Sequence, residues 1–233
     1  MSDVRWLPVA DIAELERIAC RCIIDAAGLA IEQRGEFLIV LAGGNTPRGV
    51  YRLLRTQKAD WSRWSVYFGD ERCVPVHDTE RNSRMAADEW LDHVPIAKYR
   101  IHPMAAEFGA TASALAYAAT LRNVGEFDLV LLGVGADGHT ASLFPGHDWG
   151  MSPDAPAALA VFNAPKPPSD RVSLSAARLS RARNVLFLIA GDSKRDAIAR
   201  WRAGENIPAS AIQPSGRVDV LIESKLLPKS SSQ

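Results

Sequence analysis

Segments with apolar residues at near-helical spacing take turns along the chain with short, continuous apolar runs, and these two patterns predict helices and strands in turn. Residues 11–31 carry apolar side chains at near-helical spacing, which predicts an amphipathic helix. Residues 37–41 form a continuous apolar run, which is typical of a strand buried on both faces. A second helix is expected to follow this strand, with Thr46 as its N-cap and Pro47 at its first position.

The same alternation continues through the rest of the chain. Further strands are expected at residues 66–68, 128–133, 158–162, 172–174, 185–189 and 218–222. Further helices are expected at residues 82–92, 110–122 and 193–201. Residues 146–156 predict an irregular surface loop, and the tail 229–233 is expected to be frayed. This order predicts an α/β fold: a doubly wound, mainly parallel, Rossmann-like sheet with helices on both faces.

Composition narrows the class of protein. The 233 residues fit one α/β domain spanning 1–233. Lys+Arg and Asp+Glu both number 27, so no basic field favours nucleic acid. No apolar run is long enough to span a membrane and the start does not resemble a signal peptide, so a cytoplasmic protein is expected. The odd set Cys20, Cys22 and Cys73 predicts buried thiols and no metal site.

Polar, glycine-containing segments follow three of the predicted strands directly. These segments are residues 43–46, 70–72 and 135–140. In parallel α/β sheets, ligands bind beyond the carboxyl ends of the strands. If the three strands are neighbours, the three loops therefore converge on one cleft.

The first loop has the features of a phosphate site. Gly43 and Gly44 allow close approach of the backbone, Asn45 and Thr46 add donors, and the helix start offers unpaired N–H groups. The loop matches neither of the common nucleotide-binding glycine patterns, so a nucleotide is not indicated. The alternative is an ordinary strand-to-helix turn.

The second loop combines opposite charges. Asp70 and Glu71 could perform acid–base work or position a substrate, and Arg72 could bind an anion or stabilise an oxyanion. The alternative is a surface cluster of ion pairs.

The third loop carries the sharpest chemical signal. His139 lies two residues after Asp137 in a glycine-rich turn, and a histidine can take and return a proton near neutral pH. A nearby carboxylate could orient its ring; the alternative is a structural histidine. Two later cations, Arg171 and Lys194, could complete an anion site, since a lysine at a helix start is disfavoured unless an anion offsets the helix dipole.

These segments together resemble the 6-phosphogluconolactonases, within the glucosamine-6-phosphate deaminase-like superfamily. The resemblance runs in order from about residue 8 to residue 223. The segments that carry it are residues 42–47, 68–72, 82–83, 133–146, 171–175 and 191–194. One departure is Ala42-Gly43-Gly44-Asn45, where the family usually has Ser-Gly-Gly-Ser. One hydroxyl is lost, while Asn45 still offers an amide donor.

The resemblance implies hydrolysis of 6-phospho-D-glucono-1,5-lactone to 6-phospho-D-gluconate, the second step of the oxidative pentose phosphate pathway. It implies that His139 is the general base, supported by Asp137, with Arg72 facing the substrate. Asp70 is then a site residue of less certain role. The implied phosphate ligands are Gly43, Gly44, Asn45, Thr46, Arg171 and Lys194. No metal or cofactor is implied, and a monomer acting on a small sugar-phosphate lactone is expected.

The sequence pattern has two alternative interpretations. Glucosamine-6-phosphate deaminases share the first and third loops, but their pattern carries a Glu shortly after the histidine. Residues 141–145 here contain no carboxylate. A non-catalytic sugar-phosphate sensor would keep the phosphate loop but could lose His139, and would normally carry an added DNA-binding or partner module.

Overall fold

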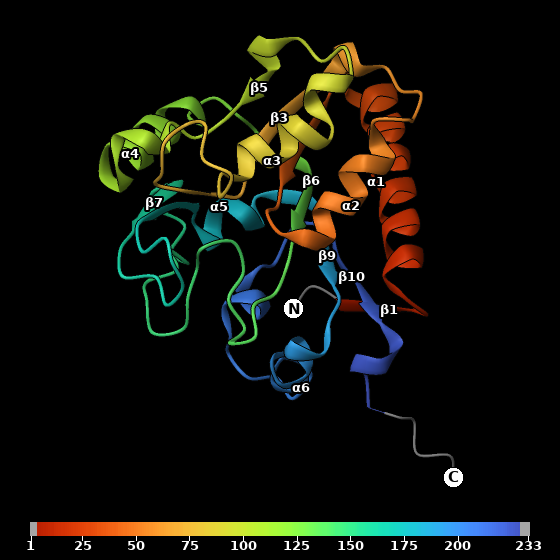
Figure 1. The fold of residues 1–233 in the computed structure, drawn as a ribbon, viewed down its shortest axis with the longest axis vertical. Helices are drawn as coiled ribbons and strands as arrows, with labels where there is room; N and C mark the ends of the chain where they lie inside the picture. The colour runs from red at the N-terminus through yellow and green to blue at the C-terminus, as the bar shows by residue number, and fades with distance from the viewer. Residues whose placement is uncertain (1–3, 229–233) are drawn as a thin grey trace.

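The computed structural model describes residues 4–228, and its main element is a seven-stranded parallel sheet (Figure 1). The strand order is β1-β10-β9-β6-β2-β3-β5. The strands are β1 (Val4–Val9), β2 (Phe37–Leu41), β3 (Trp64–Phe68), β5 (Ile101–His102), β6 (Phe127–Leu132), β9 (Ala182–Ile189) and β10 (Arg217–Glu223). Every pairing in this sheet is parallel. The predicted tail 229–233 lies outside the described residues.

Helices cover both faces of this sheet. One apolar core includes side chains of α1 (Ile12–Arg34), α2 (Asn45–Leu54) and α3 (Asn82–Glu89). The other includes side chains of α4 (Ala110–Thr120), α5 (Ala176–Ser180) and α6 (Arg195–Arg202). Short 3-10 helices connect these elements at Trp61–Arg63, Leu91–His93, Lys98–Arg100, Ala106–Phe108, Asp192–Lys194, Pro208–Ala211 and Ser224–Leu226.

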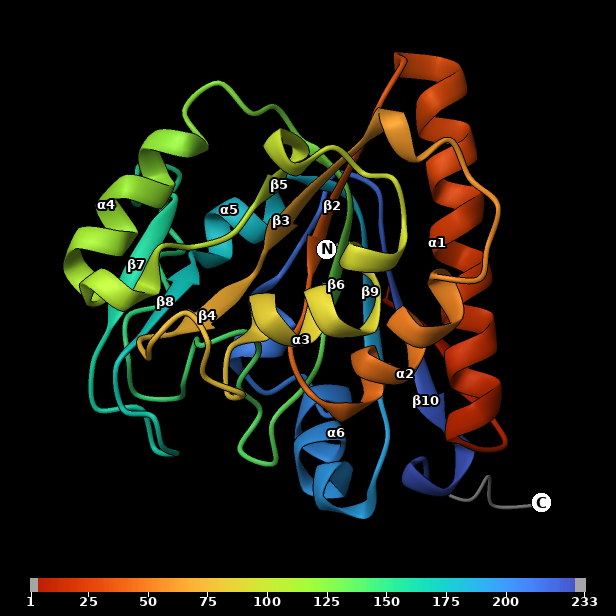
Figure 2. The ribbon, with the colours of Figure 1, turned by 45° about the horizontal axis from the view of Figure 1, so that its top comes forward.

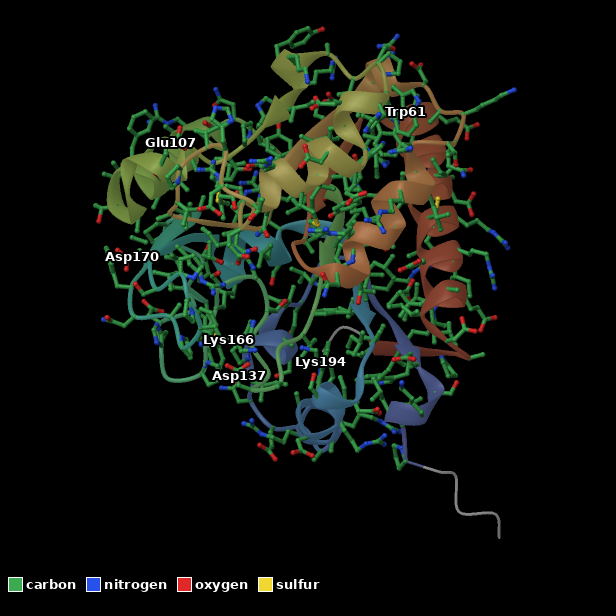
Figure 3. The ribbon with its side chains drawn as sticks, in the orientation of Figure 1. Trp61, Glu107, Asp137, Lys166, Asp170 and Lys194 are labelled. Carbon is green, nitrogen blue, oxygen red and sulfur yellow. The ribbon has the colours of Figure 1, made fainter. Side chains whose placement is uncertain are left out.

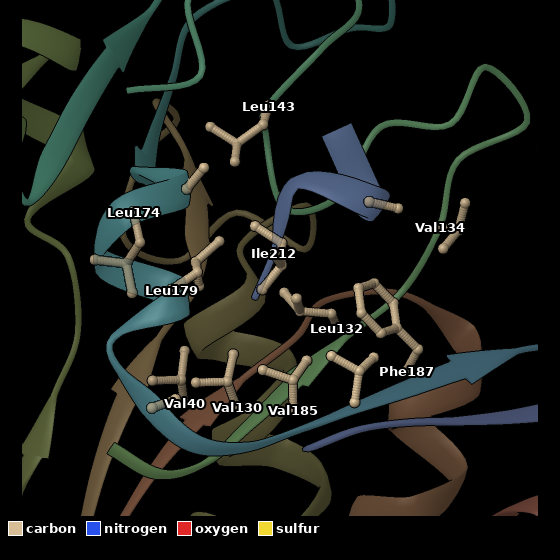
Figure 4. Close-up of a cluster of buried hydrophobic side chains, with 14 of the residues drawn as sticks. Val40, Val130, Leu132, Val134, Leu143, Leu174, Leu179, Val185, Phe187 and Ile212 are labelled. Carbon is tan, nitrogen blue, oxygen red and sulfur yellow. The ribbon is translucent and has the colours of Figure 1, made fainter. Parts of the chain in front are cut away.

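The continuous apolar strands supply both cores because successive side chains point to opposite faces. In β2, Ile39 belongs to the core under α1 and Val40 to the core on the other face. Figure 4 shows Val40, Val130 and Val185 from three neighbouring strands packed in one layer of that second core. The predicted doubly wound, mainly parallel α/β fold is therefore confirmed.

A second, smaller sheet departs from the end of β3. The chain passes through Gly69 into β4 (Asp70–Arg72), which pairs antiparallel with β8 (Arg171–Leu174), and β8 pairs with β7 (Ala158–Val161). Figure 2 shows β4, β8 and β7 grouped beside α4. The prediction of a loop at residues 70–72 was wrong, because the partner strand that makes this polar segment a β-strand lies about a hundred residues further along the chain.

Other predictions need correction. The strand β1 was missed because its pattern is mixed: it is an edge strand, which tolerates Pro8. The short elements β5 and α5 were also missed. Helix α2 begins at Asn45, with Gly44 as its N-cap at φ 103°, and not with Thr46 as N-cap. Of the three cysteines, all of them free, only Cys20 is buried, while Cys22 and Cys73 are half-buried. Within residues 4–228, no helix is both long and apolar enough to cross a membrane.

The strand order brings the predicted site loops together. The neighbours β6, β2 and β3 are the strands that the three polar segments follow. In the sheet, β3 pairs with one edge of β2, and the later strand β6 pairs with the opposite edge of β2, so the strand order reverses direction at β2. Ligands in open α/β sheets bind at such a reversal of direction, beyond the carboxyl ends of the strands. The site is therefore expected at the ends of β2 and β6.

Candidate active site

A cavity of about 330 Å³ lies at this position. Seven of the ten predicted site residues line it: Gly43, Gly44, Asp70, Arg72, His139, Arg171 and Lys194. Asn45 lines a smaller pocket beside it, of about 190 Å³, together with Arg48 and Arg72. Thr46 is half-buried in the first turn of α2, and Asp137 contacts His139 without lining the cavity.

The imidazole of His139 is held by Asp137. Nδ1 of His139 lies 2.5 Å from Oδ1 of Asp137, and the same oxygen accepts the backbone N–H of His139 at 3.2 Å. An ionised carboxylate can only accept, so the neutral ring carries its proton on Nδ1 and leaves Nε2 free of one. Nε2 has no protein partner within the described part of the chain. A base with an open lone pair therefore borders the cavity.

Burial keeps this base neutral. Burial is the largest influence on the pKa of His139 and lowers it below its ordinary value, against the opposing charge and hydrogen bond of Asp137. For Asp137, burial acts to raise the pKa, but the charge of His139 and its hydrogen bonds bring the net value below the ordinary one. At neutral pH the pair is thus an uncharged imidazole beside a carboxylate, which suits a general base.

Glycine at position 135 makes this pair possible. A Cβ added to Gly135 would collide with the imidazole ring of His139 and with the carboxylate of Asp137. The N–H of Gly135 also donates to the carbonyl of His139 at 2.7 Å, which closes the loop. The absence of a side chain at Gly135 therefore lets the backbone lie close to the His139–Asp137 pair.

The carboxylate of Asp70 is buried, and both of its oxygens accept hydrogen bonds from other side chains. Its Oδ2 accepts the hydroxyl of Ser142 at 2.6 Å, and its Oδ1 accepts the Asn82 amide at 3.1 Å. The Asn82 side chain sits where a Cβ on Gly43 would be, so that glycine is required for this contact. Asp70 thereby connects the second segment to Asn82, which packs against Gly43, and to Ser142, which follows the third segment by two residues.

Glu71 does not contribute to the cavity. Its carboxylate is fully buried, accepts the N–H groups of Asn82 and Ser83 at the start of α3, and lies 3.4 Å from Nε of Arg81. These contacts show a structural role. The hypothesis of acid–base work by both carboxylates of the second loop does not hold for Glu71.

Four cationic side chains line the cavity: Arg72, Lys166, Arg171 and Lys194. Arg72 donates from Nη1 to the carbonyl of Glu80 at 2.5 Å, and its buried Nε has no partner among the described residues. Burial lowers the pKa of Lys194, and the neighbouring charge of Lys166 lowers it further. Figure 3 shows Asp137, Lys166 and Lys194 in the same region, close to the loop that follows β6. An anionic ligand would relieve this concentration of positive charge.

Sequence reasoning missed Lys166, Asn82 as a partner of Asp70, and Ser142. Lys166 stands in a proline-rich loop five residues before Arg171, and this basic residue between prolines was the available signal. Asn82 and Ser142 lay inside the segments that carry the resemblance. Their roles depend on Asp70, which is 72 residues from Ser142 in the chain, so no local pattern shows them.

The fold and this cavity define an α/β protein with a histidine–aspartate pair in a cationic site. A family model described as glucosamine-6-phosphate isomerases/6-phosphogluconolactonase matches residues 10–221, and the chain belongs to this family.

Similar proteins agree with this assignment. A 6-phosphogluconolactonase of Mycobacterium tuberculosis is 38% identical over 226 residues, which is 90% of each chain. The solved 6-phosphogluconolactonase of Trypanosoma brucei is 27% identical, with a TM-score of 0.87 over 97% of this chain and 98% of that one. A monomeric glucosamine-6-phosphate deaminase shares the fold at 23% identity, with a TM-score of 0.82 over 95% of this chain and 98% of that one. The fold alone therefore does not separate the two activities.

Proposed function

We propose that this chain hydrolyses 6-phospho-D-glucono-1,5-lactone to 6-phospho-D-gluconate, with His139 as the general base. The observation that carries the mechanism is the 2.5 Å contact of His139 with Asp137 at the wall of a cationic cavity. The curated relatives named 6-phosphogluconolactonase support the choice of substrate. The lack of a carboxylate at residues 141–145 argues against the deaminase reaction.

The reaction begins when Nε2 of His139 takes a proton from water. The hydroxide formed adds to the lactone carbonyl carbon, and the C–O π bond moves its electron pair onto the oxygen. Arg72 is the side chain best suited to stabilise this oxyanion, because its Nε is buried and lacks a partner. The carbonyl then re-forms, the bond to the ring oxygen breaks, and the imidazolium returns its proton to that oxygen. Asp137 stabilises the imidazolium between the two steps.

The substrate phosphate would lie at the other cations and at the start of α2. Lys194 and Arg171 supply charge, and Gly43 and Gly44 bring the backbone to the cavity wall. The first N–H groups of α2, at Asn45 and Thr46, have no partner within the helix and can donate to phosphate oxygens. Binding energy from this remote group would position the lactone over His139.

The remaining expectations belong to the same proposal. We place the enzyme in the cytoplasm as a monomer acting on a small molecule. Three free cysteines are compatible with a reducing compartment, and a net charge of zero gives no general attraction to nucleic acid.

The test is a direct assay of two substrates with the purified protein. Hydrolysis of 6-phosphogluconolactone well above its spontaneous rate is expected, with no ammonia released from glucosamine 6-phosphate. The His139→Ala variant should lose at least about 10²-fold in kcat while still binding 6-phosphogluconate in calorimetry. The exposed His93→Ala is the matched control. Near-full activity of His139→Ala would refute the mechanism, and ammonia release would favour the deaminase.

A further inference from the structure

A smaller cavity, the side pocket, lies beside the main one and shares part of its wall. Its volume is about 190 Å³, and its lining comes from the start of α2, from β4 and from the connection between β4 and α3. Gly44, Arg72 and Asn82 line both cavities. Apart from Gly44 and Met85, the residues in the lining carry polar or charged side chains. The side pocket therefore suits a polar group at one end of a ligand that also occupies the main cavity.

Two guanidinium groups in this lining have buried N–H donors without an acceptor. Nε of Arg48 and Nε of Arg72 are both buried, and neither has a hydrogen-bond partner among residues 4–228. Nη1 of Arg72 is already used by the carbonyl of Glu80, so Nε is the donor that remains for a ligand. Buried donors without a partner are destabilising, and two of them in one small cavity indicate a site for an acceptor.

The carboxylate of Glu89 does not satisfy Arg48. Its two oxygens accept Nε and Nη2 of Arg52 at 2.7 and 2.9 Å. Nη1 of Arg48 lies 3.7 Å from the nearer of these oxygens, which is longer than a hydrogen bond. Arg48 is therefore free to bind a second anion from the side of the cavity.

The side pocket keeps a positive charge after its internal ion pairs are counted. Arg81 is buried and is paired with two carboxylates, at 3.4 and 3.0 Å. Glu80 is the carboxylate in the lining; its side chain is 61% exposed and lies 3.7 Å from Arg72. This one exposed charge does not offset the guanidinium groups of both Arg48 and Arg72. A planar anion with two acceptor oxygens, which is a carboxylate, matches such guanidinium donors best.

The proposed reaction creates a carboxylate. Hydrolysis converts the uncharged ester group of the lactone into a carboxylic acid, whose pKa is close to that of Asp or Glu, and this acid loses its proton at neutral pH. The product therefore carries one negative charge more than the substrate, at the end of an open chain. Because Arg72 lines both cavities, it can stay in contact with the former carbonyl group when that group moves into the side pocket.

We propose that the side pocket binds the carboxylate of the product through Arg48 and Arg72. This proposal rests on the proposed function for the identity of the ligand, and it extends that function to the release of product. Arg48 is then a ligand of the product and not of the substrate, because the substrate has no carboxylate. The affinity of the side pocket sets how strongly the product inhibits the enzyme.

Calorimetry with two open-chain ligands tests this assignment. 6-Phosphogluconate carries the carboxylate, whereas D-glucitol 6-phosphate has the same six-carbon chain with a hydroxyl group in its place. Wild type should bind 6-phosphogluconate at least about 10-fold more tightly. Arg48→Met should weaken this binding about 10-fold, the lower end for a hydrogen bond to a charged group, because its side chain is 42% exposed. Binding of D-glucitol 6-phosphate should stay within about twofold.

The matched control is Arg52→Met, four residues further along α2. It removes the same charge from the same helix and from the same partner, Glu89, but Arg52 does not line the side pocket. Arg52→Met should therefore bind both ligands as wild type does. Arg48→Lys keeps the charge but lacks the planar fork of donors, so it should recover only part of the affinity. In the lactonase assay, the inhibition constant of 6-phosphogluconate should rise in Arg48→Met by the same factor as its Kd.

Two results would overturn the proposal. Equal weakening of both ligands in Arg48→Met would show that Arg48 acts on the phosphate or on the sugar chain, and unchanged binding of 6-phosphogluconate would show that it binds neither. Failure of the proposed function is a separate outcome. If wild type hydrolyses the lactone but binds both ligands equally well, the function stands and the carboxylate subsite does not. If no lactone is hydrolysed but the preference for 6-phosphogluconate depends on Arg48, the subsite stands without the function.

Discussion

The substitution Asp137→Asn tests how the carboxylate supports the general base. It removes the negative charge that lies 2.5 Å from Nδ1 of His139 and keeps the size of the side chain. This loss changes the free energy of the neutral ring in the resting enzyme little. It raises the free energy of the imidazolium that forms when water is deprotonated, because the positive charge no longer faces a negative one.

The magnitude follows from the geometry. The centres of the two charges lie about 4 Å apart, and Coulomb's law gives about 4 kcal/mol at an effective dielectric constant of about 20. The Asp137 side chain is 38% exposed, and screening by solvent reduces this to about 2 kcal/mol. That energy corresponds to about a 30-fold loss in kcat.

The pH dependence adds a second readout with a defined sign. The base must be neutral, so kcat/KM falls as pH drops through the pKa of His139. Burial places this pKa below the ordinary value of 6.5. The charge and hydrogen bond of Asp137 raise the pKa, so their loss lowers it further. The acid limb of Asp137→Asn should therefore move to lower pH while the plateau falls.

The assay follows acid release from 6-phosphogluconolactone between about pH 5 and pH 7.5, with the spontaneous rate subtracted. The range stays acidic enough to limit attack by free hydroxide. Asp154→Asn, in the exposed loop before β7, is the control for the loss of one carboxylate. A plateau within twofold of wild type, or an acid limb displaced to higher pH, would refute the supporting role of Asp137.

Two further predictions concern the scaffold of the site. Gly135→Ala should lower kcat by about 10- to 100-fold without unfolding, because a Cβ there displaces the His139 ring; an activity equal to that of Gly28→Ala would contradict this. Glu71→Gln should lower the free energy of unfolding by about 3 kcal/mol, because it removes one of the two carboxylates beside the buried Arg81 and puts an amide donor where Glu71 accepts backbone N–H groups. In a thermal melt this is a fall in Tm of about 6–12 °C. The control is Asp88→Asn, which breaks the exposed ion pair with Arg84 and should leave the Tm nearly unchanged.

The sequence alone determined the central strands of the main sheet, but not its edge strands β1 and β5. The strands β2, β3 and β6 are nearly all apolar and lie between amphipathic helices, and burial on both faces is the simplest way to satisfy such runs. The polar segments directly after them predicted a site at the carboxyl edge. The pair Asp137 and His139 was also predictable, because two residues separated by one glycine meet through local backbone geometry.

Only the tertiary structure decided the rest of the site. The placing of β6, β2 and β3 side by side depends on strand pairing across the chain. The segment from Asp70 to Arg72 is a strand because β8 pairs with it, and Asp70 is an anchor because Ser142 and Asn82 reach it. Arg171 shows the same principle: a sequence shows that a guanidinium is present, but the carbonyls it finds belong to the folded chain. Local sequence patterns determine secondary structure and contacts between residues close in the chain. The hydrogen-bond partners of a buried polar group come from segments that meet only after folding.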